Sequence, residues 1–267
     1  MDTRRNLPGE PAANSADRSE QLATSLADCL SVRRVLEREL ALALETADLA
    51  AEEMQHFIYA VGHDLRTPLR SISSYAKLLQ RQFAEDKETS ELTGFILDGA
   101  AEMNKLIEDL LKYSRTGGPP RRTSIKLDAI VQFALMHLQS EIKESRAEIK
   151  LNQLPELAVD ESQYVQVFQQ LIGNALKFRA AAAPRIEVSA EEQDDGFVIS
   201  VADNGPGIEP KYQQTVFVPF KRLHGREIPG TGLGLSICQK IVRAHGGRMW
   251  VESDGQHGSV FKFTAPF

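Results

Sequence analysis

Apolar residues recur at alternating spacings of four and three residues in the first quarter of the chain. The series runs from Leu22 to Val61, and only Arg33 breaks it. This heptad repeat predicts a helix over residues 20–56. Such a helix could pack on its own domain, but its length without Gly or Pro favours a parallel two-chain coiled coil. Residues 1–19, rich in Pro, Ala, Ser and charge, predict a disordered tail.

The helical periodicity continues to about Arg81, and a second amphipathic run follows a charged segment. That run contains Leu92, Ile96, Met103, Leu106, Ile107, Leu110 and Leu111. The sequence TGGPP at 116–120 predicts a helix stop and a linker. We therefore expect residues 57–115 to form a helical hairpin. Its apolar faces exceed what two helices can cover, which predicts a homodimer held by a four-helix bundle.

Beyond Pro120 the helical and strand patterns alternate irregularly. The expected helices are 128–145, 162–178 and 235–244, and the expected strands are 147–151, 185–190, 197–201, 248–252 and 259–264. This mixture predicts a mostly antiparallel sheet under a layer of helices, an α/β sandwich over residues 121–267. The expected fold class is thus multi-domain α and α+β: a coiled coil and a dimeric hairpin followed by the sandwich.

Composition excludes several classes of function. The 267 residues carry 31 Lys plus Arg against 37 Asp plus Glu, a formal net charge of −6, which gives no support to nucleic acid binding. No apolar run approaches the roughly 18 residues of a membrane span, and the first residues lack the apolar core of a secretory signal. We therefore expect a cytoplasmic protein without a membrane span. Cys29 and Cys238 are too few for a disulfide framework or a metal-ligand cluster.

The sequence HDLRTPL places His63 at an outward-facing position of the heptad register. A carboxylate such as that of Asp64 can hold one ring nitrogen as N–H and make the other more nucleophilic. Thr67 lies one turn further along the same face. Pro68 removes an N–H and clashes with a carbonyl one turn back, so the helix should bend or loosen just after the histidine. A solvated surface histidine without a role is the alternative.

Two further motifs combine polar residues with tight turns. Asn174 and Lys177 share a face of the expected helix 162–178, where an amide oxygen can bind Mg²⁺ and an ammonium can bind phosphate. Asp203 ends an apolar strand and is followed by Gly205 and Gly207 around a proline. A carboxylate there could accept a hydrogen bond from an exocyclic amine such as that of adenine. An ordinary helix surface and an ordinary β-turn are the alternatives.

A glycine loop precedes the expected helix 235–244. It comprises Gly230, Thr231, Gly232, Leu233 and Gly234. Backbone N–H groups at a helix start bind phosphates, but the spacing fits neither a dinucleotide-binding nor a P-loop motif. The basic segment from Phe217 to Pro229 lies between this loop and the preceding turn, and could close over a nucleotide or be a surface loop.

Taken together and in this order, the motifs resemble those of the sensor histidine kinases of two-component systems. HDLRTP at 63–68 is similar to their H box, NALKF at 174–178 to the N box, and DNGPG at 203–207 to the first glycine box. FVPF at 217–220 resembles the F box, and residues 230–234 the second glycine box. The resemblance covers residues 57–267, and RLHGREIPGTGLGLSICQKIVRAHGG is similar to the kinase modules of bacterial phytochromes.

The resemblance implies a role for each matching residue. His63 would accept phosphate from ATP, Asp64 would act as general base, and Thr67 would position water for dephosphorylation of a partner. The implied nucleotide site comprises Asn174 (which would also bind Mg²⁺), Lys177, Asp203, Gly205, Gly207, Phe220, Arg222, Gly230, Thr231, Gly232, Leu233 and Gly234. The implied fold is a dimeric hairpin followed by an ATP-binding domain of the gyrase and chaperone type. The implied partner is the receiver domain of a response regulator.

The chain departs from the family pattern in three respects. Gln170 stands where a second Asn is common, so the Mg²⁺ shell could differ, and Gly62 stands where Ser or Ala is commoner. Residues 1–56 leave no room for a sensor domain, and the sequence does not say whether a separate sensor protein supplies the signal. Two alternatives remain: a catalytically silent dimeric scaffold that senses nucleotide, and an ATPase or serine kinase of the same superfamily.

Overall fold

The computed structural model describes residues 13–180, 182–223 and 230–267. The chain divides into two compact units, residues 1–56 and 57–267. Among the described residues, no helix has a stretch both long and apolar enough to cross a lipid bilayer. Residues 13–19, which the sequence analysis placed in a disordered tail, belong to the start of helix α1. Residues 1–12 lie outside the described part of the chain.

The first unit contains the N-terminal part of helix α1 (Ala13–Gln82). Heptad residues of this part are exposed in the single chain: Leu36 is 59%, Leu40 61% and Met54 58% exposed. The charged heptad residue Arg33 pairs with Glu37, at 3.2 Å. An uncovered apolar stripe is what a coiled-coil partner would bury, and the coiled coil remains a prediction.

The second unit begins with a helical hairpin, as predicted. The C-terminal part of α1 packs against α2 (Lys87–Arg115). The hairpin core comprises Leu69, Ala100, Ile107 and Leu111, with Ile58 packed against it. Helix α2 begins where the carboxylate of Asp86 accepts a hydrogen bond from the Glu88 N–H, and it ends directly before the TGGPP segment.

Two features of α1, a proline and a glycine, lie close to His63. Helix α1 continues through Pro68, so the expected bend or loosening after His63 does not interrupt it. Leu69, buried against α2, stabilises the helix at this point despite the lost hydrogen bond. Gly62 is buried, and a Cβ atom there would lie 3.1 Å from Leu111. The glycine therefore lets α2 approach α1 closely beside His63.

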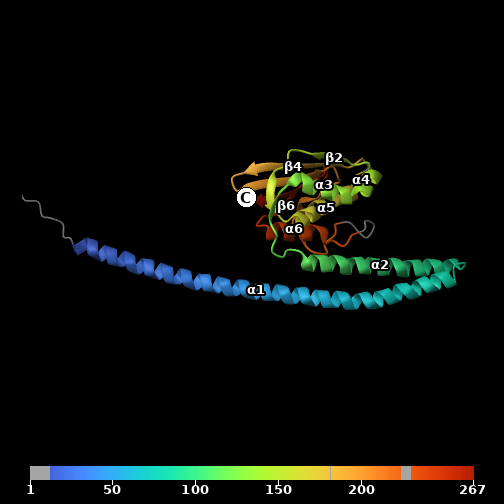
Figure 1. The fold of residues 1–267 in the computed structure, drawn as a ribbon, viewed down its shortest axis with the longest axis horizontal. Helices are drawn as coiled ribbons and strands as arrows, with labels where there is room; N and C mark the ends of the chain where they lie inside the picture. The colour runs from blue at the N-terminus through green and yellow to red at the C-terminus, as the bar shows by residue number, and fades with distance from the viewer. Residues whose placement is uncertain (1–12, 181, 224–229) are drawn as a thin grey trace, which may run out of the picture. The chain divides into compact units, whose positions relative to one another are not determined.

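Residues 123–267 form the expected α/β sandwich (Figure 1). The five-stranded sheet has the order β2-β4-β5-β7-β6, with β2 parallel to β4 and the other pairs antiparallel. Its strands are β2 (Glu148–Leu151), β4 (Arg185–Gln193), β5 (Gly196–Asp203), β6 (Met249–Glu252) and β7 (Ser259–Pro266). A small antiparallel sheet of β1 (Thr123–Lys126) and β3 (Glu156–Val159), which the sequence did not predict, lies apart from it.

Helices cover one face of the five-stranded sheet. They are α3 (Leu127–His137), α4 (Gln139–Ser145), α5 (Glu161–Lys177) and α6 (Gly234–Ala244), and two short 3₁₀ turns, η1 (Pro210–Tyr212) and η2 (Thr215–Phe217), precede α6. The single helix predicted over 128–145 is wrong, because Leu138 leaves helical geometry and separates α3 from α4. The core centres on three aromatic rings: Phe263 of β7 meets Tyr164 and Phe168 of α5 edge to face.

The opposite face of the sheet is polar. Lys150 pairs with Glu187 at 2.8 Å, and Lys262 pairs with Glu252 at 2.6 Å. The one tryptophan of the chain, Trp250, donates its indole N–H to Glu252. Alternation along β6 places Trp250 on this outer face, since its neighbours Met249 and Val251 belong to the core.

The buried residue His245, at the end of α6, is hydrogen-bonded to the segments that contain Arg122 and Asp160. The Asp160 N–H donates to Nε2 of His245 at 3.1 Å, so Nδ1 is the protonated nitrogen and donates to the carbonyl of Ile241. The guanidinium of Arg122 donates to the His245 carbonyl. Burial lowers the pKa of His245, and the positive charge of Arg122 lowers it further, against opposing effects of Ile241 and Asp160.

This lowered pKa makes the free energy of unfolding depend on pH. The unfolded chain binds a proton at His245 more tightly than the folded chain, so the stabilisation is complete above about pH 6.5 and is lost as the pH falls below it. We expect His245→Gln to flatten the change in unfolding free energy between about pH 7 and pH 5. Urea unfolding, monitored by circular dichroism at each pH, measures the free energy of unfolding. His137→Gln, which changes an exposed histidine, should keep the wild-type slope, and equal slopes in all three proteins would contradict the assignment.

Candidate nucleotide site

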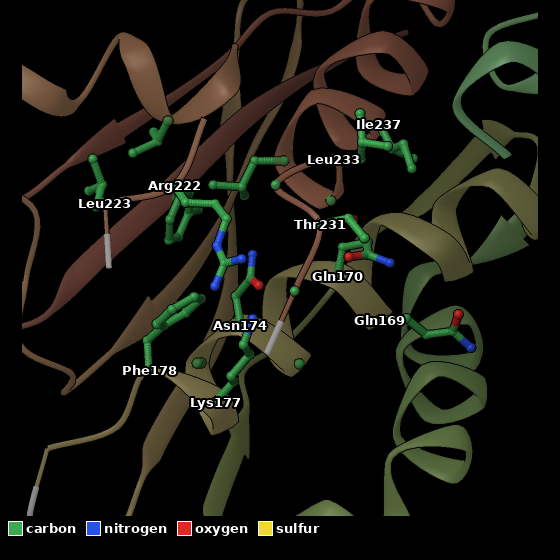
Figure 2. Close-up of a pocket in the computed structure, with 18 of the residues that line it drawn as sticks. Gln169, Gln170, Asn174, Lys177, Phe178, Arg222, Leu223, Thr231, Leu233 and Ile237 are labelled. Atoms are coloured by element: carbon green, nitrogen blue, oxygen red, sulfur yellow. The ribbon is translucent and has the colours of Figure 1, made fainter. Parts of the chain in front are cut away.

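A cavity of about 790 Å³ opens between α5, the loop after β5 and the loop before α6 (Figure 2). Most of the nucleotide-site residues expected from the sequence line it: Asn174, Lys177, Asp203, Gly207, Arg222, Gly230, Thr231, Gly232, Leu233 and Gly234. The fold therefore brings together residues from three motifs that are far apart in the sequence. The volume suits a ligand of nucleotide size.

Helix α5 supplies one wall because its two faces differ. Its apolar face, with Phe168 and Leu171, is buried in the core. Gln170, Asn174 and Lys177 recur at spacings of four and three and so share the face toward the cavity. The amide of Gln170 points to the backbone of Gly234, since a Cβ atom at Gly234 would clash with its Oε1.

Positive charge gathers at the Lys177 side of the cavity. The Lys177 ammonium lies 4.5 Å from the centre of the Phe178 ring and against Gly230, where a Cβ atom would clash with it. Burial lowers the pKa of Lys177, and the positive charges of Arg222 and Lys105 lower it further. All three cationic residues line the cavity, and the side chains of Lys177 and Arg222 are both in view in Figure 2. A site with several close cations favours a polyanion.

The other wall carries a carboxylate among apolar side chains. Burial raises the pKa of Asp203, against hydrogen bonds from the backbone of Gly205 and Ser259 that lower it. The Gly205 N–H donates to Asp203 Oδ1 at 2.8 Å, and Ser259 lies opposite Asp203 in the pairing of β5 and β7. Apolar lining comes from Ile208, Val216, Leu223 and Phe261. A partly desolvated acceptor beside apolar walls suits a flat heterocycle with an amino group.

The glycine loop fits tightly against the segment before it. Gly232 has φ +77°, and a Cβ atom there would lie 2.9 Å from both the Lys221 carbonyl oxygen and the Phe220 carbonyl carbon. The Phe220 N–H donates to the Gly232 carbonyl at 3.1 Å. Helix α6 begins at Gly234, one residue before the predicted start, so the N–H groups of its first turn lie beside the cavity.

Two expected nucleotide residues are not among those that line the cavity. Gly205 is buried, and a Cβ atom there would lie 2.7 Å from the Phe178 carbonyl oxygen. Phe220 has a left-handed backbone, with φ 63°, and its side chain is 52% exposed. Both shape the adjoining loops through the backbone. Of the expected lid at 217–229, residues 224–229 lie outside the described part of the chain.

The expected phosphoacceptor group lies on α1. The His63 side chain is 73% exposed, and its Nδ1 lies 3.2 Å from Oδ1 of Asp64. Thr67, one turn further on, is exposed as well. None of these three residues is among those that line the cavity. The structure therefore groups the predicted residues into two sets, one on the hairpin and one around the cavity.

Some lining residues were missed by the sequence analysis. Helix α2 contributes Lys105, Asp109 and Lys112, and the Thr231 hydroxyl donates to Asp109 at 2.8 Å. Their spacing in an amphipathic helix is that of any exposed face, so no local signal marks them. Ser259 opens a strand and likewise carries no motif of its own.

Two known protein families match separate regions of the chain, one that includes the hairpin and one that includes most of the cavity residues. Residues 53–119 match the family described as His Kinase A (phospho-acceptor) domain. Residues 159–267 match the family described as histidine kinase-, DNA gyrase B-, and HSP90-like ATPase. Both matches fall on regions that the sequence motifs singled out.

Several curated proteins are similar over most of this chain. Phytochrome-like protein Cph1 of Synechocystis is 37% identical, over 85% of this chain and 31% of its own length. Cyanobacterial phytochrome A of Nostoc is 38% identical, over 85% of this chain and 30% of its own length. Sensor histidine kinase WalK of Bacillus subtilis is 31% identical, over 81% of this chain and 37% of its own length. The chain spans about a third of the length of these relatives.

Solved structures agree with the fold. Full-length ShkA in complex with AMPPNP superposes with a TM-score of 0.60 at 26% identity, over 79% of this chain and 45% of that chain. Histidine kinase ThkA in complex with response regulator protein TrrA superposes with a TM-score of 0.56 at 22% identity, over 78% of this chain and 60% of that chain. At this identity the likeness supports the fold alone. The matched domains, the relatives and the fold agree, and the chain therefore belongs to the two-component sensor histidine kinases.

Proposed function

We propose that the chain is an ATP-dependent protein histidine kinase that phosphorylates His63. The observation that carries this proposal is the cavity, with a partly desolvated carboxylate on one wall and clustered cations on the other. These are the groups that an adenine amine and a triphosphate require. The complex of the similar kinase ShkA with AMPPNP supports the same kind of ligand.

In this proposal each part of ATP has its own contacts. Asp203 accepts a hydrogen bond from the adenine amine, between the apolar walls. Lys177 and Arg222 bind phosphate oxygens, and the N–H groups at the start of α6 add to this binding. Gly207 and the loop 230–234 let the backbone approach the ligand closely.

The residues of the cavity fit a magnesium ion bound together with the nucleotide. Among the described residues, no cluster of three or more His, Cys, Asp or Glu side chains could hold a metal ion alone. Mg²⁺ commonly takes few protein oxygens and completes its shell with waters and phosphates. The amide oxygen of Asn174 is the proposed protein ligand, and Gln170 is near enough along α5 to assist. When bound, the ion would neutralise charge on the phosphates.

Phosphoryl transfer then follows from the arrangement at His63. Asp64 faces Nδ1 and leaves Nε2 as the nucleophile. As Nε2 bonds to the γ-phosphorus, the bond to the bridging oxygen breaks and ADP leaves. The carboxylate of Asp64 takes the Nδ1 proton, which keeps the phosphorylated ring neutral. The cavity and His63 are separate here, so transfer requires the ATPase domain to approach a His63, either its own or that of a second copy.

We also propose a homodimer and a response regulator as partners. Apolar side chains of the hairpin are left exposed in one copy, and burying them in a four-helix bundle is favourable: Leu65, Ile72, Tyr75, Leu79, Phe95, Ile96 and Met103. As in the two-component sensor histidine kinases that the motifs resemble, the phosphate acceptor would be an aspartate of a response regulator's receiver domain. Because the donor is ATP, we propose that the chain acts in the cytoplasm.

The first prediction tests the acceptor. His63→Gln should abolish autophosphorylation, because an amide cannot take the phosphate, while ATP binding should stay unchanged. Labelled ATP with Mg²⁺ gives the incorporation, and calorimetry gives the affinity. His56→Gln, an exposed change one heptad earlier on the same helix, should label normally. Undiminished label on His63→Gln would refute the assignment. A wild-type protein that binds ATP but takes no label would instead support the silent scaffold.

The second prediction tests the base contact. Asp203→Asn should weaken ATP binding about ten- to a hundredfold, since a hydrogen bond to a charged group contributes roughly 1.5–3 kcal/mol. GTP should bind more weakly than ATP to the wild type, because its carbonyl cannot donate to Asp203. Calorimetric titration measures both. Equal ATP affinity in the variant would place the adenine contact elsewhere.

The third prediction separates two activities of the hairpin. Asp64→Ala should strongly lower autophosphorylation, because it removes the base beside His63. Thr67→Ala should spare autophosphorylation but slow dephosphorylation of the regulator, which needs a water oriented by a hydroxyl or amide. Both rates can be measured with a phosphorylated receiver domain and labelled ATP. Parallel loss of both rates in each variant would rule out separate roles.

A further inference from the structure

The turn between β6 and β7 packs directly against the loop after β5. A Cβ atom at Gly258 would clash with the Asp203 carbonyl oxygen. A Cβ atom at Gly207 would lie 2.7 Å from the Gln256 nitrogen. The loop that forms the carboxylate wall of the cavity therefore has the β6–β7 turn behind it, with little space between the two backbones.

One hydroxyl connects these two segments. The Ile208 N–H donates to Ser253 Oγ at 2.9 Å, and that hydroxyl donates to the Gly258 carbonyl at 2.6 Å. The Gly255 N–H also donates to Ser253 Oγ, at 3.2 Å. A serine hydroxyl has one donor and two acceptor sites, so all three are used.

The side-chain amide of Gln213 connects a third segment, the one that leads to the expected lid, to the same turn. Nε2 of Gln213 donates to the Ser253 carbonyl at 2.7 Å and lies 3.5 Å from the Ile208 carbonyl. Gln213 lies between η1 and η2. Three segments thus meet at Ser253: the loop after β5, the β6–β7 turn and the η1–η2 segment.

We propose that Ser253 is a positioning residue for the base side of the nucleotide cavity. Ser253 is not among the residues that line the cavity, whereas Ile208, whose N–H donates to its hydroxyl, and the adjacent Gly207 are. Ser253 acts through them, because it fixes the backbone that follows Asp203. This inference rests on the proposed function, since it takes the Asp203 wall to be the adenine side.

The hydrogen bonds of the Ser253 hydroxyl indicate what its removal would change. Without it, the Ile208 N–H loses its acceptor and the loop after β5 becomes less ordered before ligand binds. Nucleotide binding must then order the loop, which weakens affinity. The phosphate contacts and His63 are unchanged, so the rate at saturating ATP should not change.

The test compares Ser253→Ala with Ser253→Cys, which keeps the side-chain shape but forms weak hydrogen bonds. We expect the Kd for ATP and the Kd for ADP to rise by the same factor, about three- to tenfold. The autophosphorylation rate at saturating ATP should stay within about twofold of wild type, with the whole effect in KM. Calorimetry and initial rates measure these quantities, and either variant suffices if the other fails to fold.

The matched control is Ser124→Ala, which removes the hydroxyl of a serine that does not line the cavity. The Ser124 hydroxyl donates to Glu156, between β1 and β3, at 2.6 Å. The Ser124→Ala variant should bind ATP as the wild type does. An unchanged Kd in the Ser253 variants, an equal loss in Ser124→Ala, or a changed ratio of ADP to ATP affinity would each overturn the inference. A wild type that fails to bind ATP would instead refute the proposed function.

Discussion

The packing of α5 against the sheet is the interaction on which the site depends. Its aromatic residues Tyr164 and Phe168 meet Phe263 in the core, which fixes the rotation of the helix about its axis. With that rotation set, the helical period places Asn174 and Lys177 at the cavity. A shift of one residue in this packing would turn both side chains away from the ligand, so the core and the chemistry are specified together.

The cations around the cavity favour a negatively charged ligand. Burial lowers the pKa of Lys177, and the positive charges of Arg222 and Lys105 lower it further. A polyanion would reverse the sign of the interaction. The cluster of positive charge thus favours phosphate-bearing ligands over neutral ones.

The sequence predicted the elements whose signal is local. The α5 helix, the paired strands β4 and β5, and the glycine loop that opens α6 all follow from periodicity and turn residues. The β1–β3 sheet was missed because its strands have four residues each and depend on pairing across the chain. The lining residues of α2, such as Asp109, were missed for a related reason: only tertiary structure brings them to the cavity.

The position of Trp250 determines what its fluorescence reports. The indole lies on the outer face of the sheet, with Arg248 5.1 Å from its ring centre and Glu252 as its acceptor. It is the one tryptophan of the chain and does not line the cavity. Its emission is therefore an intrinsic reporter of the β6–β7 edge of the sheet, and a nucleotide titration followed by that emission would be silent unless binding deforms the sheet itself.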